Sequence, residues 1–293
     1  MDTLDIIKFI SKDLSQINYG NLYKLIGDLK LSCILPFKIP KGTKIIRLRP
    51  SINIPFDNLS QISYNPNNND YGRANSPNSI MFYGAVEVPK AYNPLLTSSF
   101  EILHILENGK YKIDKDSIEL TFGEWITQKE ISVVPIIYFQ KYLQKNILFK
   151  SIYENYCNSF LSNDRDTAII NFIANEFAKS HIIKKSDYKI SAVFTDYIMN
   201  FFTGNPQGVL YPSVRTDGLG FNIALKPSVI DSRYLKLERV YTMNMYIKGS
   251  VGALDGKDYT DKIDCNGKFK LEKCLKDDWN KGREYCLSLI DKN

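Results

Sequence analysis

The chain has 293 residues, of which 44% are apolar and 24% charged, and this composition is typical of a globular protein with a sizeable core. Its net charge of +6 comes from lysines and arginines that are spread along the chain, which argues against direct nucleic-acid binding through a basic stripe. Five cysteines without a CxxC pair argue against a disulfide framework, and two histidines leave little for a zinc site or a Ser-His-Asp hydrolase.

The N-terminal part of the chain predicts helices. Apolar residues recur at helical spacing within residues 3–31, which favours one or two amphipathic helices. The segment lacks the unbroken apolar core of a signal peptide, and the chain has no apolar run as long as the roughly 18 residues of a membrane helix. We therefore expect a cytoplasmic protein with no membrane contact. Residues 33–44 predict a proline-punctuated connector, and residues 44–50 predict a strand that Pro50 ends.

A long polar loop and a strand come next. Residues 65–79 are rich in Asn, Pro and Gly and predict a long loop, and residues 79–88 predict a buried strand. A short helix follows, because Ser98 and Glu101 have the spacing of a capping box and Asn108-Gly109 supplies a stop.

The second half of the chain predicts helices and then strands. Residues 135–180 and 188–202 read as mostly helical, whereas residues 208–213 and 220–227 read as two short strands around a turn. Residues 234–247 alternate as a long strand with one apolar face, which only Arg239 interrupts. From residue 250 the chain is dense in charge and predicts a small surface appendage or a partly ordered tail. The order of elements predicts an α+β domain with a mixed sheet over residues 41–249, an N-terminal helical extension over residues 1–40 and a charged C-terminal appendage over residues 250–293.

Two stretches of the chain resemble the signatures of the RES-domain family. The chain has no P-loop, no GxGxxG after a strand, no HExxH and no GxSxG. However, GRANSPNSIMFYGA at residues 72–85, with Arg73 ten residues before Tyr83, is similar to the first signature of this family. GVLYPSVRTDGLGFNIALKP at residues 208–227, with Ser213 and Asn222, is similar to the second. Arg47 in the upstream sequence RLRP resembles the arginine of the family's opening strand.

The resemblance implies an enzyme that uses NAD+ as its substrate and needs no metal. Members of the family resemble ADP-ribosyltransferases in fold and cleave NAD+, and they are the toxins of bacterial toxin–antitoxin pairs. We therefore expect residues 41–249 to form an NAD-binding catalytic domain that cleaves the nicotinamide–ribose bond with water or phosphate. The resemblance further implies a helix-turn-helix antitoxin protein as a possible partner.

The resemblance also implies a role for each site residue. Cleavage of the bond develops positive charge on the ribose, which a carboxylate stabilises, and this role falls to Glu101. Arg73 and Arg47 would bind the phosphates, Tyr83 would pack beside the nicotinamide, and Ser213 would bind the ribose. Asn222 is expected at the cofactor-binding site in a structural role.

Two of these assignments have an alternative. Pro94 stands where the family pattern places its glutamate, so Glu101 requires a short insertion after Tyr83, and Glu87 is the alternative carboxylate. Arg49 lies on the same face of its strand as Arg47 and is the alternative arginine.

Two other functions are also open. The same site would serve a protein ADP-ribosyltransferase, which needs an acceptor protein. A catalytically silent module that binds NAD+ or a partner is the third possibility, because the insertion before Glu101 could move the carboxylate out of reach. The two ends of the chain lie outside the resemblance, and they could gate the site, form a homodimer or replace an antitoxin contact.

Overall fold

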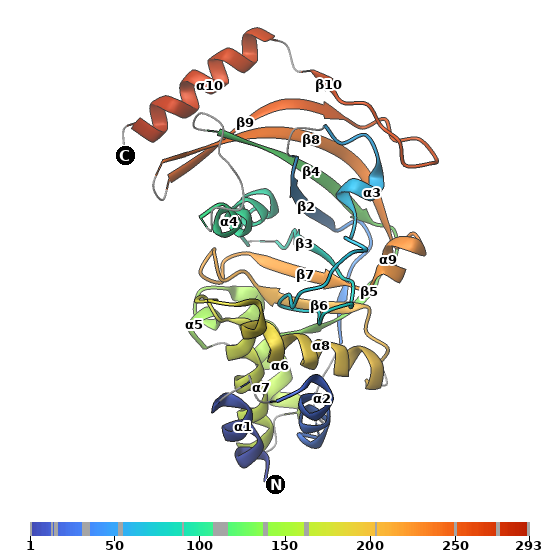
Figure 1. The fold of residues 1–293 in the computed structure, drawn as a ribbon, viewed down its shortest axis with the longest axis vertical. Helices are drawn as coiled ribbons and strands as arrows, with labels where there is room; N and C mark the ends of the chain where they lie inside the picture. The colour runs from blue at the N-terminus through green and yellow to red at the C-terminus, as the bar shows by residue number, and fades with distance from the viewer. Residues whose placement is uncertain are drawn as a thin grey trace.

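The computed structural model describes residues 2–12, 14, 17–30, 36–51, 55–89, 91–107, 117–136, 140–160, 164–202, 204–248, 251–273 and 276–291. These residues have an α+β fold, which confirms the predicted class. Their strands form one mixed sheet in the order β1-β5-β6-β7-β3-β2-β4-β8-β9-β10 (Figure 1).

The strands have the following bounds: β1 (Phe37–Ile39), β2 (Lys44–Pro50), β3 (Phe82–Val86), β4 (Ser117–Thr127), β5 (Ile131–Pro135), β6 (Gly208–Pro212), β7 (Phe221–Leu225), β8 (Leu235–Lys248), β9 (Val251–Thr260) and β10 (Glu272–Lys273). The helices are α1 (Thr3–Lys12), α2 (Tyr19–Asp28), α3 (Leu59–Ile62), α4 (Pro94–Glu107), α5 (Gln140–Leu143), α6 (Ile147–Phe160), α7 (Asp164–Phe177), α8 (Lys189–Phe201), α9 (Pro227–Asp231) and α10 (Lys276–Asp291), with a 3₁₀ turn at Lys185–Tyr188.

A bent two-stranded ribbon closes part of the sheet into a ring. Ile39 of β1 pairs with Ile131 of β5, and five residues further along the chain Lys44 of β2 pairs with Ile126 of β4. The antiparallel ladder therefore keeps its register across the bend at residues 40–43. At one end of this ribbon β2 pairs with β3, and at the other end β5 pairs with β6. Because β3, β7 and β6 pair in succession, these strands form a closed ring around the core.

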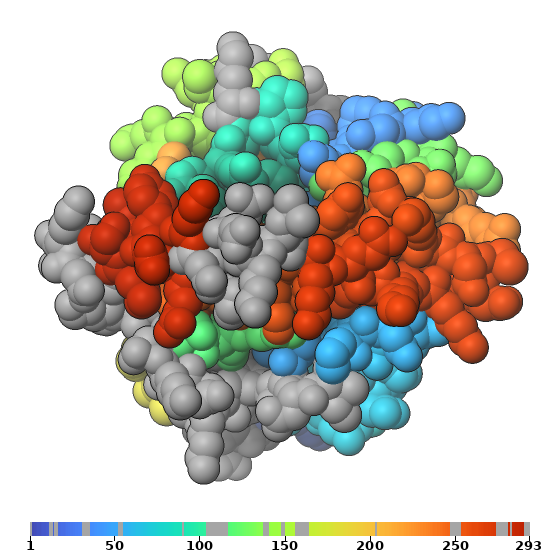
Figure 2. Space-filling view, turned by 90° about the horizontal axis from the view of Figure 1, so that it is seen from above, coloured from blue at the N-terminus to red at the C-terminus, as the bar shows by residue number. Residues whose placement is uncertain are grey.

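The helices cover this sheet in three places. α1 and α2 pack against α7 and α8, and their buried residues Ile6, Ile10, Leu22 and Ile26 belong to the same core as the ring. α4 lies in the hollow of the curved sheet against β2, β3 and β7 (Figure 1). At the opposite end from α1 and α2, α10 packs along β9, and the segment from β9 to α10 spreads across the face seen from above (Figure 2). No helix within the described ranges has the length and apolar character needed to cross a bilayer.

Most of the predicted elements are confirmed. Residues 3–31 contain α1 and α2, residues 44–50 form β2 and end at Pro50, and residues 79–88 contain β3. The helix predicted at residues 188–202 is α8, and the pair of short strands is the antiparallel hairpin of β6 and β7. The ordered loop at residues 65–79 contains the small turn Gly72–Asn75.

The capping box predicted at Ser98 and Glu101 is wrong. α4 begins at Pro94, one turn earlier, and the side chain of Asn93 accepts a hydrogen bond from the backbone N–H of Leu95 at 2.8 Å. The hydroxyl of Ser98 instead donates to the carbonyl of Pro94 at 2.6 Å, inside the helix. The predicted helix end at Asn108-Gly109 lies outside the described residues.

The predicted single apolar face of the long strand is also wrong, because β8 contains a β-bulge. The register of β4 with β8 shifts between Glu124 and Trp125, which makes Glu238 the extra residue. Leu237 therefore faces the main core, whereas Tyr241 and Met243 pack on a second apolar cluster on the other side of the sheet. A bulge reverses the alternation of side chains beyond it, and Arg239 marks the point of reversal.

Two further segments differ from their predicted roles. The predicted connector contains β1, a short strand that pairs with β5. Residues 251–260, predicted within a charged appendage, form β9 and pair with β8 along most of its length, so the sheet continues beyond residue 249.

A glycine at the centre of the fold allows β2 and β3 to approach each other. A Cβ atom at Gly84 would lie 2.6 Å from Cγ2 of Ile45 and 3.1 Å from the carbonyl oxygen of Ile46. We expect Gly84→Ala to lower the free energy of unfolding by about 1–3 kcal/mol, as overpacking of a core does. Urea denaturation tests this, with Gly256→Ala in β9 as the control, because nothing lies within 4 Å of a Cβ atom there. Equal midpoints for the two variants would contradict the prediction.

Candidate functional site

A cleft opens where two central strands separate. β2 and β3 pair only at Ile45–Val86 and Ile46–Ala85, after which β2 continues with β4 and β3 continues with β7. The cleft at this point has a volume of about 210 Å³, and α4 forms one of its walls. It is lined by Ile46, Arg47, Leu48, Tyr83, Gly84, Ala85, Ser98, Glu101, Ile102, Tyr211 and Asn222.

The carboxylate of Glu101 is held through one of its two oxygens. The hydroxyl of Ser213 donates to Oε1 at 2.7 Å, and the side-chain amide of Asn222 donates to the same oxygen at 2.8 Å. Oε2 has no hydrogen bond to any described residue. Since Glu101 lines the cleft, Oε2 is the oxygen that a ligand there can use. Three predicted site residues from α4 and the β6–β7 hairpin therefore meet at one carboxylate.

The β6–β7 hairpin fixes the two donors. Asn222 pairs with Tyr211 across the strands, and the backbone N–H of Ser213 donates to the carbonyl of Gly220 at 2.9 Å. Ser213 is fully buried and does not line the cleft. Its hydroxyl therefore contacts Glu101 from outside the cleft and orients the carboxylate.

Arg47 brings an uncompensated positive charge into the cleft. Nη1 donates to the carbonyl of Tyr83 at 2.6 Å, the guanidinium lies 5.1 Å from the centre of the Phe82 ring, and the buried Nε has no hydrogen-bond partner. Burial, together with the charge of Arg49, lowers the pKa of Arg47 to about 9, so the group is still charged at neutral pH. No acidic side chain of the described residues forms an ion pair with it, and buried charges ordinarily have such a partner.

The alternative arginine lies outside the cleft. Nη1 of Arg49 donates to the carbonyl of Gln61 at 2.8 Å, next to the end of α3. Arg49 is not among the residues that line the cleft, whereas Arg47 is. The structure therefore favours Arg47 over Arg49 at this position.

Tyr83 connects the cleft to the glycine-arginine turn. Its hydroxyl donates to Oδ1 of Asn75 at 2.5 Å and accepts from the backbone N–H of Ala74 at 3.0 Å. A Cβ atom at Gly72 would lie 2.3 Å from Oδ1 of Asn75 and 2.9 Å from the hydroxyl of Tyr83, which explains the glycine. Burial raises the pKa of Tyr83, so the hydroxyl stays protonated and available as a donor. The turn and the strand thus form one unit around this hydroxyl.

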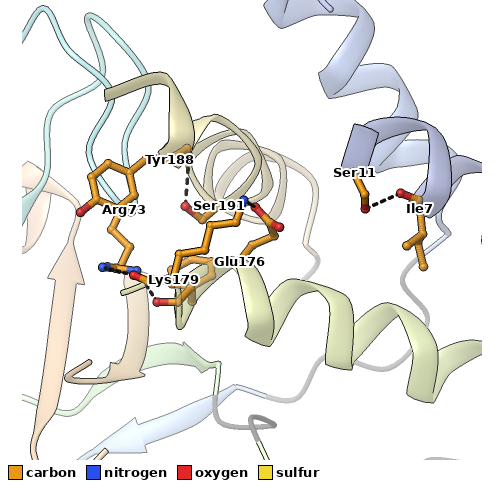
Figure 3. Close-up of polar contacts among 8 residues, drawn as sticks. Ile7, Ser11, Arg73, Glu176, Lys179, Tyr188 and Ser191 are labelled. Carbon is orange, nitrogen blue, oxygen red and sulfur yellow. Dashed lines mark hydrogen bonds and ion pairs between the residues drawn. The ribbon is translucent and has the colours of Figure 1, made fainter. Parts of the chain in front are cut away.

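Arg73 projects from this turn toward α7 and does not line the cleft (Figure 3). Its guanidinium donates to the carbonyl of Phe177 and, at 3.1 Å, to the carbonyl of Lys179, and it lies 4.9 Å from the centre of the Tyr188 ring. The last carbonyls of a helix lack partners within the helix and carry partial negative charge. Arg73 satisfies two carbonyls at the end of α7, and a phosphate contact from it stays a prediction.

The two candidate carboxylates lie in different cavities. Glu87 lines a separate cavity of about 730 Å³, which is bounded by the bend at residues 40–43 and by the segment that leads into α4. None of the other predicted site residues lines that cavity. The structure groups Glu101, and not Glu87, with Arg47, Tyr83 and Asn222.

Tyr211 is a cleft residue that the sequence reasoning missed. It is almost fully buried, lines the cleft beside Asn222, and has its pKa raised by burial. Tyr211 pairs with Asn222 across β6 and β7, and residues directly opposite each other in an antiparallel pair share a face, so its place in the predicted hairpin could have indicated it.

Within the described part of the chain, no three His, Cys, Asp or Glu side chains lie close enough together to hold a metal ion. Comparison of the chain with known protein families and with curated proteins found no match.

Proposed function

We propose that the chain is an NAD+-consuming enzyme that cleaves the bond between nicotinamide and ribose. The observation that carries the proposal is the pairing of Glu101, held through Oε1 by Ser213 and Asn222, with the buried and uncompensated Arg47 in one cleft. A fixed carboxylate and a fixed cation are the two charges that a reaction passing through a cationic ribose on a phosphate-bearing substrate requires.

Glu101 would act on the ribose. As the bond from C1′ to the pyridinium nitrogen breaks, its electron pair goes to the nitrogen, nicotinamide leaves as a neutral molecule, and positive charge develops on the ribose. Oε2 of Glu101 can face that charge. Because Ser213 and Asn222 already hold Oε1, the carboxylate does not have to reorganise during the reaction. Water or phosphate then forms the new bond to C1′, and in the case of water a proton passes to the solvent.

Arg47 would bind the phosphate next to that ribose. A guanidinium can form two parallel hydrogen bonds to an oxyanion. Nη1 of Arg47 donates to the carbonyl of Tyr83, whereas its Nε has no hydrogen-bond partner, so part of the donor capacity of the group is left for a phosphate. Tyr83 supports the cleft wall and holds the turn that contains Arg73. In this proposal Arg73 positions the turn. The toxin role and the antitoxin partner stay predictions from the resemblance.

The proposal predicts that the purified chain releases nicotinamide from NAD+. Chromatography should detect nicotinamide together with an equal amount of ADP-ribose when water is the acceptor, or of ADP-ribose phosphate in phosphate buffer. A labelled protein adduct would instead identify a protein as the acceptor. A folded protein that binds NAD+ but releases no nicotinamide, whether water, phosphate or a protein is offered as the acceptor, would contradict the proposal and favour a silent binding module.

A further inference from the structure

We infer that the cleft recognises a single nucleotide unit, made of one planar ring, one ribose and one phosphate, and that the adenylate half of NAD+ lies outside it. This inference rests on the proposed function and specifies its substrate class. It predicts that nicotinamide mononucleotide is a substrate in its own right.

The size of the cleft is the first argument. Its volume of about 210 Å³ is below the roughly 300–1,000 Å³ of pockets that enclose a drug-sized ligand. A dinucleotide is larger than such a ligand, so the cleft can enclose only a part of it. The separate cavity that contains Glu87 shares no lining residue with the cleft and does not enlarge it.

The charges of the cleft are the second argument. Arg47 is the one cationic side chain among the described residues that line it. The two other arginines that the sequence motifs offered have contacts elsewhere, since Arg49 donates to Gln61 and Arg73 donates to the end of α7. A pyrophosphate carries two charged groups, and the described lining offers a cation to only one of them.

The remaining lining matches the other two parts of a nucleotide. Ile46, Leu48 and Ile102 provide an apolar wall, as a planar ring requires. Glu101 lines the same space, and its Oε2, which has no hydrogen bond to a described residue, can accept hydrogen bonds from ribose hydroxyls. One apolar wall, one acceptor and one cation correspond to ring, ribose and phosphate.

Three substrates test the inference on the full chain. Nicotinamide release is measured from NAD+, nicotinamide mononucleotide and nicotinamide riboside. We expect kcat/KM for the mononucleotide to lie within about tenfold of that for NAD+. The riboside has no phosphate for Arg47, so its kcat/KM should be lower than that of the mononucleotide by about 10- to 100-fold. In Arg47→Met this difference should shrink to about twofold, whereas the control Arg49→Met should keep it.

The outcomes separate the inference from the proposed function. Release from NAD+ that exceeds release from the mononucleotide by more than about 100-fold would overturn the inference and leave the function standing. Release from none of the three would overturn the function, and calorimetric binding would then decide the inference. Dissociation constants for the mononucleotide and NAD+ within about tenfold of each other would support it. Binding of NAD+ alone, or of neither compound, would overturn it.

Discussion

Glu101→Gln should release nicotinamide from NAD+ about 10²- to 10³-fold more slowly than the unchanged chain, because it removes the charge that faces the cationic ribose. Glutamine has the same shape as glutamate, and its carbonyl oxygen can still accept from Ser213 and Asn222. The loss should therefore appear in kcat, with the binding of substrate and the midpoint of urea unfolding little changed. Nicotinamide release under saturating NAD+ measures it directly.

A second glutamate provides the matched control. Glu87→Gln makes the same chemical change in the separate cavity and should leave the rate within about twofold of the unchanged chain. Ser213→Ala, which removes one of the two donors to Oε1, should lower the rate by about tenfold, since the loss of one hydrogen bond loosens the carboxylate. A rate that falls with Glu87→Gln and survives Glu101→Gln would reverse the assignment of the two carboxylates.

The elements that the sequence predicted well are those in which local pattern and tertiary position agree. β2 is a short strand that ends at Pro50, β3 and the β6–β7 hairpin are short and mainly apolar, and α8 has an apolar stripe on one side. In these segments the secondary structure that burial requires is the same one that the local sequence favours. The order of the elements then sufficed for the α+β class.

The errors arose where a tertiary contact decides the structure. β1 is three residues long and exists because β5 lies beside it. The bulge in β8 depends on its pairing with β4, which the alternation within β8 alone does not contain. Ser98 and Glu101 have the spacing of a capping box, but the same spacing also occurs in the middle of helices. The hydrogen bond that Asn93 accepts from Leu95 shows that this helix begins earlier.

The candidate site shows the same division. Ser213, Asn222, Tyr83 and Arg47 lie in one region, because strands and their hairpin carry these residues to a common place. The contacts of a long side chain on a loop, in contrast, do not follow from the strand pattern. Arg73 reaches away from its turn and ends on α7, and nothing near it in the sequence indicates that residues more than a hundred positions later would accept its hydrogen bonds.

Arg73→Met should lower the free energy of unfolding by about 1.5–3 kcal/mol, because it removes charge-assisted hydrogen bonds to two carbonyls at the end of α7 and leaves those carbonyls unpaired. Urea denaturation followed by circular dichroism measures this loss. Arg73→Lys should recover part of it, since an ammonium can reach the same carbonyls but lacks the planar fork that binds both together.

The kinetic effect of this variant should be small where the protein remains folded, and this distinguishes positioning from phosphate binding. If Arg73 only fixes the turn, KM for NAD+ changes less in Arg73→Met than in Arg47→Met, where the cation of the cleft itself is lost. If Arg73 binds a phosphate, KM rises in both variants, and the lysine substitution restores it because a point charge is enough to attract an anion. An unchanged unfolding midpoint together with a raised KM would show that the contacts of Arg73 with the two carbonyls do not stabilise the fold, and that Arg73 binds the phosphate of the substrate.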